Sequence, residues 1–192
     1  MKEQNTQQSR NTQNDGNTDV IVLGVGTSGE DISHQLLDAG LHVTGIEASM
    51  VGGECPYWAC LPSKMMVRAS NAIQEARRVG DLAGDVKVKP DWSPVAEKIR
   101  SLTANWDDSA AIKRYEDQGG RMIKGRGKLT GPRTVSVNGE SITARRGIII
   151  ATGSTMFIPP IPGLEDIEYW TTHEVIWQVM SKSNLIGVLL QR

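Results

Sequence analysis

Hydrophobic and polar positions divide the start of the chain into a polar leader and a series of apolar segments. Residues 1–18 are rich in Gln, Asn, Thr and Ser, so we expect a disordered leader. The run Val20–Leu23 is apolar and is followed by glycine, which is typical of a strand buried on both faces. Thr27–Ala39 has apolar residues at helical spacing before Gly40, and 41–47 returns to a strand pattern. This order predicts a βαβ unit.

Two long amphipathic helices are predicted next. The first spans 61–79, where small and apolar side chains recur at spacings of three and four on one helical face. A loop at 81–90 separates it from Ser93-Pro94, a favourable helix start with serine as N-cap and proline at the first helical position. Apolar residues then continue at helical spacing as far as Ala110, which predicts one uninterrupted second helix.

The pattern changes from helix to strand after Gly119-Gly120. Short strands are predicted in Arg121–Leu129, Thr134–Val137 and Ser141–Arg145. The pair Asn138-Gly139 indicates a type I′ hairpin turn, and Ile148–Ala151 predicts a further, fully buried strand. The predicted fold class is therefore α/β, with a Rossmann-like parallel sheet, helices and a β-meander.

A glycine-rich turn joins the first predicted strand to the first helix. Gly24 suits the tight turn, Gly26 lets the backbone approach a pyrophosphate, and Gly29 allows helix and strand to pack closely. The helix N-terminus offers N–H groups to the phosphates, and Glu47 ends the second strand, where it can bind ribose hydroxyls. These features predict a dinucleotide site. The alternative is a turn without a ligand, and the acidic Glu30 counts against tight phosphate binding.

The two cysteines, Cys55 and Cys60, lie immediately before the predicted 61–79 helix. In a regular helix, residues five apart rise about 7.5 Å, beyond the usual Cα separation of about 4.4–6.8 Å in a disulfide. A bridge between them needs a distorted first helical turn, which Pro56 and Pro62 favour. A helix N-terminus or a nearby cation such as Lys64 would lower the pKa of a reactive thiol.

Two other interpretations of the cysteine pair stay open. A zinc site is disfavoured because the three histidines, His34, His42 and His173, are not at ligand spacing from the pair, so we predict no metal. Two buried structural thiols are also compatible with the spacing.

The composition and charge of the chain argue against several classes of binding partner and location. Lys plus Arg number 21 and Asp plus Glu 22, for a formal net charge of −1, so nothing favours nucleic acid or an anionic membrane as main partner. No apolar run approaches the roughly 20 residues of a spanning helix, and the N-terminus has no apolar signal core. With two cysteines the chain is unlike a secreted disulfide scaffold, so we expect a cytoplasmic location.

Three motifs in this order carry a family resemblance. They are the glycine-rich turn with Glu47, the segment from Gly52-Gly53 through both cysteines to Pro62-Ser63-Lys64, and the strand end Ala151-Thr152-Gly153-Ser154. The combination resembles the class I pyridine nucleotide–disulfide oxidoreductases, which include dihydrolipoamide dehydrogenase, glutathione reductase and mercuric reductase. The resemblance runs from about Val20 to Trp177.

The resemblance implies a flavoenzyme in which electrons pass from NAD(P)H to FAD, then to a Cys55–Cys60 disulfide, and then to a disulfide or related small-molecule substrate. Cys60 would face the flavin, Cys55 would exchange with the substrate, and Lys64 would lie near the flavin ring. The residues implied in FAD binding are Gly24, Gly26, Gly29, Glu47, Gly53, Lys64, Gly125, Arg126, Gly127, Ala151, Thr152 and Gly153.

The sequence departs from the family pattern in two places. The linker Pro56-Tyr57-Trp58-Ala59 is bulkier than the small, glycine-containing linker of many relatives, which leaves the substrate open. The run 184–192 has one glycine where the family has a second glycine motif. We therefore expect an incomplete family fold, in which the NAD(P)-binding and dimerisation domains are absent. Its predicted parts are the leader 1–18, an FAD-binding domain with a redox-active disulfide at 19–158, and a connector at 159–192.

Full-length members of the family are homodimers, and the resemblance does not extend that property to a chain without the dimerisation domain. Two alternatives to a partial enzyme stay open. The chain could be a stand-alone FAD-binding module completed by a second polypeptide, or a truncated product without function.

Overall fold

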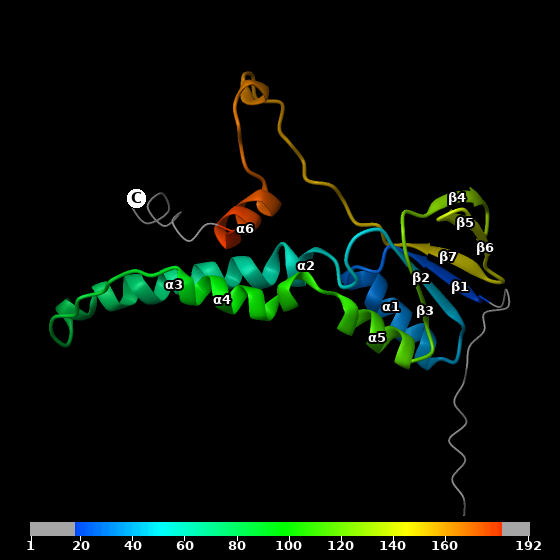
Figure 1. Ribbon diagram of the computed structural model, residues 1–192, viewed down its shortest axis with the longest axis horizontal. Coiled ribbons are helices and arrows are strands. Elements are labelled where there is room, and N and C mark those ends of the chain that lie inside the picture. The colour runs from blue at the N-terminus through cyan, green and yellow to red at the C-terminus, as the bar shows by residue number, and fades with distance from the viewer. Residues whose placement is uncertain (1–17, 182–192) are drawn as a thin grey trace, which may run out of the picture.

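The computed structural model describes residues 18–181 as an α/β core, a small β-meander and a long helical hairpin that projects from the core (Figure 1). The core sheet has the strand order β3-β2-β1-β7, and its pairings are parallel. Its strands are β1 (Val20–Leu23), β2 (Val43–Glu47), β3 (Arg121–Lys124) and β7 (Gly147–Ile150). The βαβ unit is confirmed, with α1 (Thr27–Asp38) between β1 and β2.

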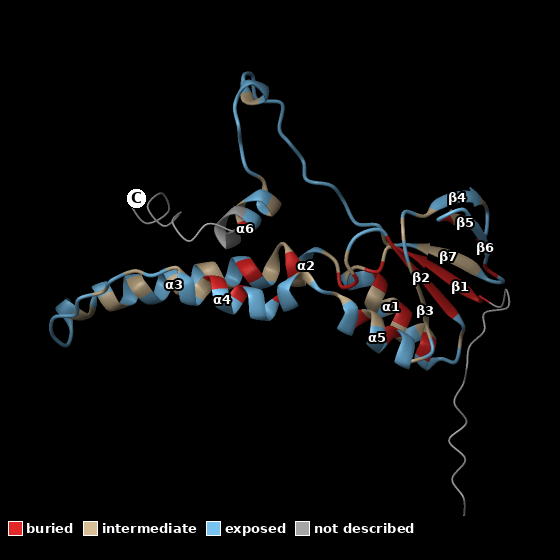
Figure 2. Cartoon of the chain, in the orientation of Figure 1, coloured by how far each residue is buried: buried red, intermediate tan, exposed pale blue. Residues whose placement is uncertain are grey.

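Alternate residues of β1 face two different cores, which explains why the whole strand is apolar. On one face, Val20 and Val22 pack with Leu37 and Tyr115 from α1 and α5 (Ser109–Asp117). On the other face, Ile21 and Leu23 pack with Val135 and Val137 of the meander. All four β1 residues are buried, and Figure 2 shows the buried positions concentrated in this sheet and the helices against it. The predicted two-sided burial of β1 is confirmed.

The meander contains β4 (Lys128–Gly131), β5 (Thr134–Val137) and β6 (Glu140–Thr143), all antiparallel. Asn138 and Gly139 have φ angles of 50° and 83°, as the predicted type I′ turn requires.

The prediction of one strand over Arg121–Leu129 is wrong, because β3 and β4 belong to different sheets. The Gly125 N–H still donates to the Glu47 carbonyl oxygen at 2.8 Å, which closes the β2–β3 ladder. The chain then leaves the parallel sheet through Gly127. A Cβ there would lie 2.5 Å from Leu23 Cδ1, so only glycine passes between the two sheets without displacing the core.

The helical hairpin is formed by α2 (Glu54–Tyr57), α3 (Cys60–Arg77) and α4 (Ser93–Leu102). The start of α4 differs in detail from the prediction. Its N-cap residue is Trp92 and not Ser93, no side chain caps the helix, and the Asp91 carboxylate accepts the Ser93 N–H at 2.9 Å. Pro94 does occupy the first turn, as predicted.

The prediction of a single second helix as far as Ala110 is wrong. The chain leaves α4 at Leu102, passes through a short 3₁₀ segment, Ala104–Trp106, and starts α5 at Ser109. The three residues of that segment have positive φ angles of 50°, 54° and 57°, a conformation that ends an α-helix. The break lets α4 belong to the hairpin while α5 covers the sheet (Figure 1).

After β7 the chain forms an extended, exposed strap that leads to α6 (Thr172–Ser181). Ile176 of α6 is 2% exposed and packs with Ala96 and Ile99 of α4. Figure 1 shows α6 returning to the hairpin at the end of the strap. The prediction of a fully buried strand at Ile148–Ala151 is wrong, because β7 is an edge of the described sheet and Ile150 is 61% exposed.

Thr18, at the end of the predicted leader, is buried, and its hydroxyl bonds that of Thr44 at 2.8 Å. The rest of the leader and the C-terminal run 184–192 lie outside the described residues. The boundaries at 158 and 159 stay a prediction. Within residues 18–181, no helix combines the length and the apolar character that crossing a bilayer requires.

Asp19 ties the starts of several strands together. Its carboxylate accepts the His42 N–H at 3.0 Å and bonds the guanidinium groups of Arg145 and Arg146. The His42 N–H first, and then Arg145, hold the pKa of Asp19 well below its ordinary value of 3.8. The ionised carboxylate therefore stabilises the fold above about pH 3.8, and this stabilisation is lost as the pH falls through the lower, folded-state pKa.

We expect Asp19→Asn to lower the melting temperature by several degrees at pH 7, because the amide cannot accept from His42 and from both arginines. The difference from the wild type should shrink as thermal unfolding is repeated below pH 3.8. Asp85→Asn, in the exposed loop 82–92, is the matched control and should change little. A difference between wild type and Asp19→Asn that persists unchanged into strong acid would contradict this account.

Candidate active site

The glycine-rich turn lies directly against the strand end Ala151-Thr152-Gly153. Gly24 has a φ of +89°, and a Cβ there would lie 2.5 Å from the Ala151 carbonyl oxygen. A Cβ on Gly29 would lie 1.9 Å from the Gly24 carbonyl oxygen. Two segments predicted separately from the sequence therefore meet, and the glycines are required by backbone contacts. Thr152 and Gly153 are exposed at the carboxyl end of β7.

The cysteine segment reaches the same turn from the other side. Gly26 pairs with Gly52 in an isolated parallel bridge, and a Cβ on Gly53 would lie 2.8 Å from Gly26 Cα. Gly26 is also the N-cap residue of α1, with no side chain to bond the first N–H groups of that helix. The result is a cradle without side chains at a helix N-terminus, the arrangement that accepts a phosphate.

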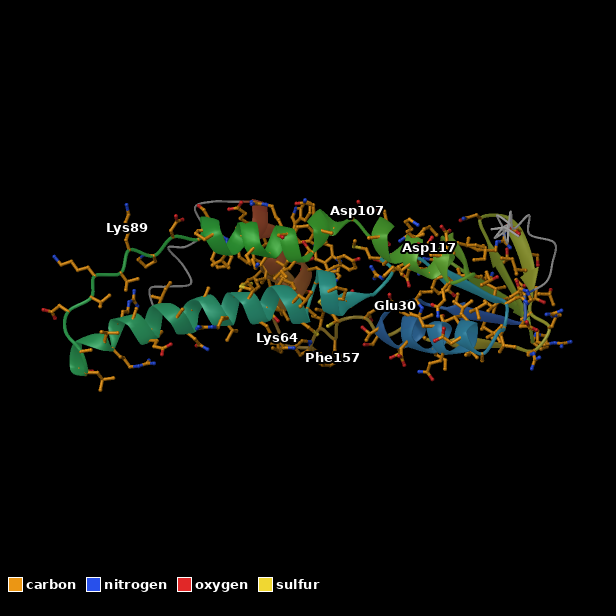
Figure 3. All side chains as sticks on the ribbon, turned by 90° about the horizontal axis from the view of Figure 1, so that it is seen from below. Glu30, Lys64, Lys89, Asp107, Asp117 and Phe157 are labelled. Carbon is orange, nitrogen blue, oxygen red and sulfur yellow. The ribbon has the colours of Figure 1, made fainter. Side chains whose placement is uncertain are left out.

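Glu30, which counted against phosphate binding, is paired within the protein. Its carboxylate lies 3.6 Å from Arg114 of α5 and 3.8 Å from His34. Figure 3 labels Glu30 on α1. The Arg114 guanidinium partly offsets the negative charge that Glu30 places near the cradle.

Glu47 has a structural role that the sequence did not reveal. It is 8% exposed, and its two carboxylate oxygens accept the N–H groups of Val25 at 2.6 Å and Ser49 at 2.7 Å. Glu47 thus holds the glycine-rich turn and the loop after β2 at the same time. A carboxylate has about four acceptor positions, so each oxygen keeps capacity for a ribose hydroxyl.

Asp108 and Lys124 also hold this loop, and sequence reasoning missed both. Asp108 accepts the Val51 N–H at 2.8 Å and pairs with Lys124 Nζ at 2.6 Å. Lys124 also donates to the Ser49 carbonyl oxygen. The contacts join residues 57 and 75 positions apart, so no local pattern could have indicated them.

The helix that carries the cysteines is interrupted between them, as the spacing argument required for a bridge. Residue Ala59 has φ −130° and ψ −88°, outside the helical region, and α3 begins at Cys60. Both cysteines are half-buried and unbonded. Of the groups around the Cys55 thiol, the Cys60 side chain has the largest effect on its pKa.

The hydrogen bond with Cys60 raises the pKa of the Cys55 thiol above its ordinary value of 9.0, and burial raises it further. Lys64 acts in the opposite direction, since its ammonium favours the thiolate. Lys64 is exposed on α3, one turn after Cys60, and is labelled in Figure 3.

We expect Cys60→Ala to lower the pKa of Cys55 toward 9.0, because the largest cause of the upward shift is removed. Thiolate is the reactive form, so alkylation of Cys55 by iodoacetamide at pH 8 should become several-fold faster. The measurement is the alkylation rate as a function of pH, followed by mass spectrometry. Adding Lys64→Met should move the midpoint back up, whereas Lys87→Met, in the exposed loop, should not. An unchanged midpoint in Cys60→Ala would refute the assignment.

The remaining sequence-predicted residues lie where the chain crosses between the sheets. Gly125 packs on Asn138, since a Cβ there would lie 2.5 Å from Asn138 Oδ1. Gly127 is required by the Leu23 contact described above, and Arg126 between them is exposed. The packing accounts for both glycines without a ligand. Among residues 18–181, no three His, Cys, Asp or Glu side chains gather as a metal-binding group.

The family model described as pyridine nucleotide-disulphide oxidoreductase matches residues 18–185. The chain belongs to this family. The chain is similar to a mercuric reductase from Bacillus cereus, with 30% identity over 179 residues that cover 92% of this chain and 28% of the relative. A dihydrolipoyl dehydrogenase from Acholeplasma laidlawii is 27% identical over 77% of this chain and 44% of the relative.

Among solved structures, the HOCl-induced flavoprotein disulfide reductase RclA from Escherichia coli superposes with a TM-score of 0.64. The match has 22% sequence identity and covers 82% of this chain and 33% of that one. At this identity the similarity shows the fold, which confirms the predicted combination of parallel sheet, helices and meander. The chain spans 28% to 44% of the lengths of the two curated relatives named above.

Proposed function

We propose that this chain is the FAD-binding, redox-disulfide portion of a flavin-dependent NAD(P)H:disulfide oxidoreductase. The observation that carries the proposal is the meeting of three segments at one place. The glycine-rich turn, the Gly52-Gly53 turn that leads to the cysteines, and the Ala151 strand end contact one another through backbone atoms. A nucleotide cradle and a dithiol are therefore built on one continuous framework.

The residues present fit a dinucleotide. Gly24, Gly26, Gly29 and Gly53 would line the cradle, where a Cβ at Gly53 would lie 2.8 Å from Gly26 Cα, and the first N–H groups of α1 have no partner within the helix. Glu47 would bind the adenosine ribose with its remaining acceptor positions. The backbone of Gly125–Gly127 would run alongside the adenine, and residues Ala151 to Gly153 would lie against the dinucleotide. When bound, FAD would supply hydride acceptance and electron transfer to the disulfide.

The protein's own chemistry is thiol–disulfide exchange at the cysteine pair. Cys55 would attack a substrate disulfide, and Cys60 would then displace the substrate thiol and close the Cys55–Cys60 bond. Lys64 favours the thiolate form of Cys55, which the exchange requires. In the full-length protein, NAD(P)H would supply the electrons, and two subunits would associate. We propose a cytoplasmic location, where a close cysteine pair is more often redox-active than structural.

The dithiol role is tested by oxidising the reduced 192-residue chain with glutathione disulfide and measuring its intact mass. The wild type should lose two hydrogens and carry no glutathione, because the second cysteine displaces it. Cys55→Ser and Cys60→Ser should each instead retain one glutathione as a mixed disulfide. A wild-type chain that keeps two bound glutathione molecules would show that the cysteines do not act as a pair.

A further inference from the structure

An aromatic cluster lies against the interruption between the two cysteines. It consists of Trp58, Trp106, His173 and Trp177. The Trp58 and His173 rings are stacked, with centroids 4.8 Å apart and planes 26° apart. Trp58 also meets Trp106 at 5.5 Å, and Trp106 meets Trp177 edge-on at 6.0 Å. The cluster therefore brings α6, beyond the strap, onto the cysteine segment.

The cluster contains Trp58, which lies between the cysteines, and contacts two further residues of this segment. Trp106 Nε1 donates to the Tyr57 carbonyl oxygen at 3.2 Å. His173 Nε2 lies 2.6 Å from Oε2 of Glu54, the residue that precedes Cys55 in the sequence. Trp58 itself is half-buried between the two aromatic neighbours. The backbone at Tyr57 and the side chain of Glu54 are thus bonded from outside the segment, by residues 49 and 119 positions away.

Within the segment, backbone hydrogen bonds join the interruption to the helices on either side, including one from the Ser63 N–H to the Ala59 carbonyl oxygen at 3.1 Å. The N–H groups of Trp58 and Ala59 both donate to the Glu54 carbonyl oxygen at 2.8 Å. Pro62 has no N–H to bond the Trp58 carbonyl, so a regular helix cannot run through this point. Proline therefore requires an interruption but does not select one geometry for the cysteines. The contacts of the aromatic cluster add to these backbone bonds from outside the segment.

We propose that Trp58 and His173 are positioning residues that set the redox potential of the Cys55–Cys60 pair. This inference rests on the proposed function, in which the pair forms a disulfide. Holding the interruption in one shape keeps the two thiols within reach of each other and so favours the bond. Without the cluster, the segment samples shapes in which the side chains separate, and a disulfide in those shapes is strained. Loss of the stack should make the disulfide easier to reduce.

The equilibrium that reports this effect is a balanced two-electron exchange with glutathione. The two protein thiols and one glutathione disulfide give the Cys55–Cys60 disulfide and two glutathione thiols. The S–S bond of glutathione breaks, the protein S–S bond forms, and the two thiol protons pass to the glutathione sulfurs. A tenfold change in the equilibrium constant corresponds to about 30 mV in reduction potential.

The test is titration of the 192-residue chain against glutathione buffers, with the oxidised fraction read by mass spectrometry after alkylation. Trp58→Ala and His173→Ala should each lower the equilibrium constant for oxidation by about tenfold. Trp58→Phe, which keeps a ring against His173, should restore most of it. Trp170→Ala removes a tryptophan that is 43% exposed on the strap and should leave the constant unchanged. Equal constants for wild type, Trp58→Ala and His173→Ala would overturn the proposal.

A second measurement uses the wild type and does not depend on variants that fold. With histidine labelled for NMR, the His173 resonances should shift when the pair is oxidised, while those of His34 and His42 stay in place. A wild-type disulfide that forms without any change at His173 would refute the positioning role but leave the proposed function intact. Failure to form the disulfide at all would instead refute the proposed function, so the two claims are separated.

Discussion

Gly29→Ala should cost about 3 kcal/mol of unfolding free energy, near the upper end of the usual penalty for overpacking. The reason is steric, because the new Cβ would lie 1.9 Å from the Gly24 carbonyl oxygen and 3.4 Å from Ala151 Cβ. Neither neighbour can move freely, since Gly24 is itself pressed against the Ala151 backbone. Urea unfolding followed by circular dichroism measures the loss, as a lower midpoint with an unchanged slope.

Gly80→Ala is the matched control for this experiment. Gly80 lies at the far end of the hairpin, and a Cβ there would meet no atom within 4 Å. Alanine should be neutral or slightly stabilising at this position, because it restricts the unfolded chain. Equal midpoints for wild type and Gly29→Ala would mean that helix α1 does not pack on the turn as described.

Glu47→Gln should have the second large effect, on stability and on nucleotide binding together. The carboxylate accepts two backbone N–H groups while 8% exposed. An amide would turn its NH₂ toward one of these donors and leave that N–H unpaired. Hydrogen bonds to charged groups contribute about 1.5–3 kcal/mol, so we expect a loss in that range. Unfolding in urea and FAD titration, both on the same variant, measure the two effects.

The comparison variant is Glu168→Gln, on the exposed strap, which changes the charge equally and should leave both properties unaltered. If Glu47→Gln weakened FAD binding without loss of stability, Glu47 would act only on the ligand. If it lost stability without weakening FAD binding, Glu47 would act only on the turn. Either result would contradict the double role inferred from its contacts with Val25 and Ser49.

The central strands and the glycine-rich turn could be predicted from sequence because local rules dominate there. Val20–Leu23 is apolar on every residue since both faces of the strand are buried, and Asn138-Gly139 has the positive φ angles that few residue pairs accept. The glycine-rich turn, the cysteine segment and the Ala151 strand end could be recognised for the same reason. Each depends on residue types at fixed spacing, and the structure brings the glycine-rich turn together with Gly53 and Ala151.

The contacts that position the site could not be predicted, because they join residues far apart in sequence. Asp108 bonds the Val51 N–H across 57 positions, and His173 reaches Glu54 across 119. The break before α5 was hidden in an unbroken helical pattern, and only the positive φ angles of residues 104–106 reveal it. Likewise, Ile148–Ala151 has the composition of a buried strand, but its position at a sheet edge is a property of topology.

The most direct test of the account is titration of the purified chain with FAD, followed by flavin fluorescence and visible absorption. We predict saturable uptake of one FAD per chain. Gly26→Ala should bind at least about tenfold more weakly, because its methyl group fills the phosphate cradle. This variant should still fold, since its Cβ would lie an ordinary 3.5 Å from Gly53 Cα. No uptake by the wild type, or equal affinity in Gly26→Ala, would contradict the assignment of this turn as a dinucleotide site.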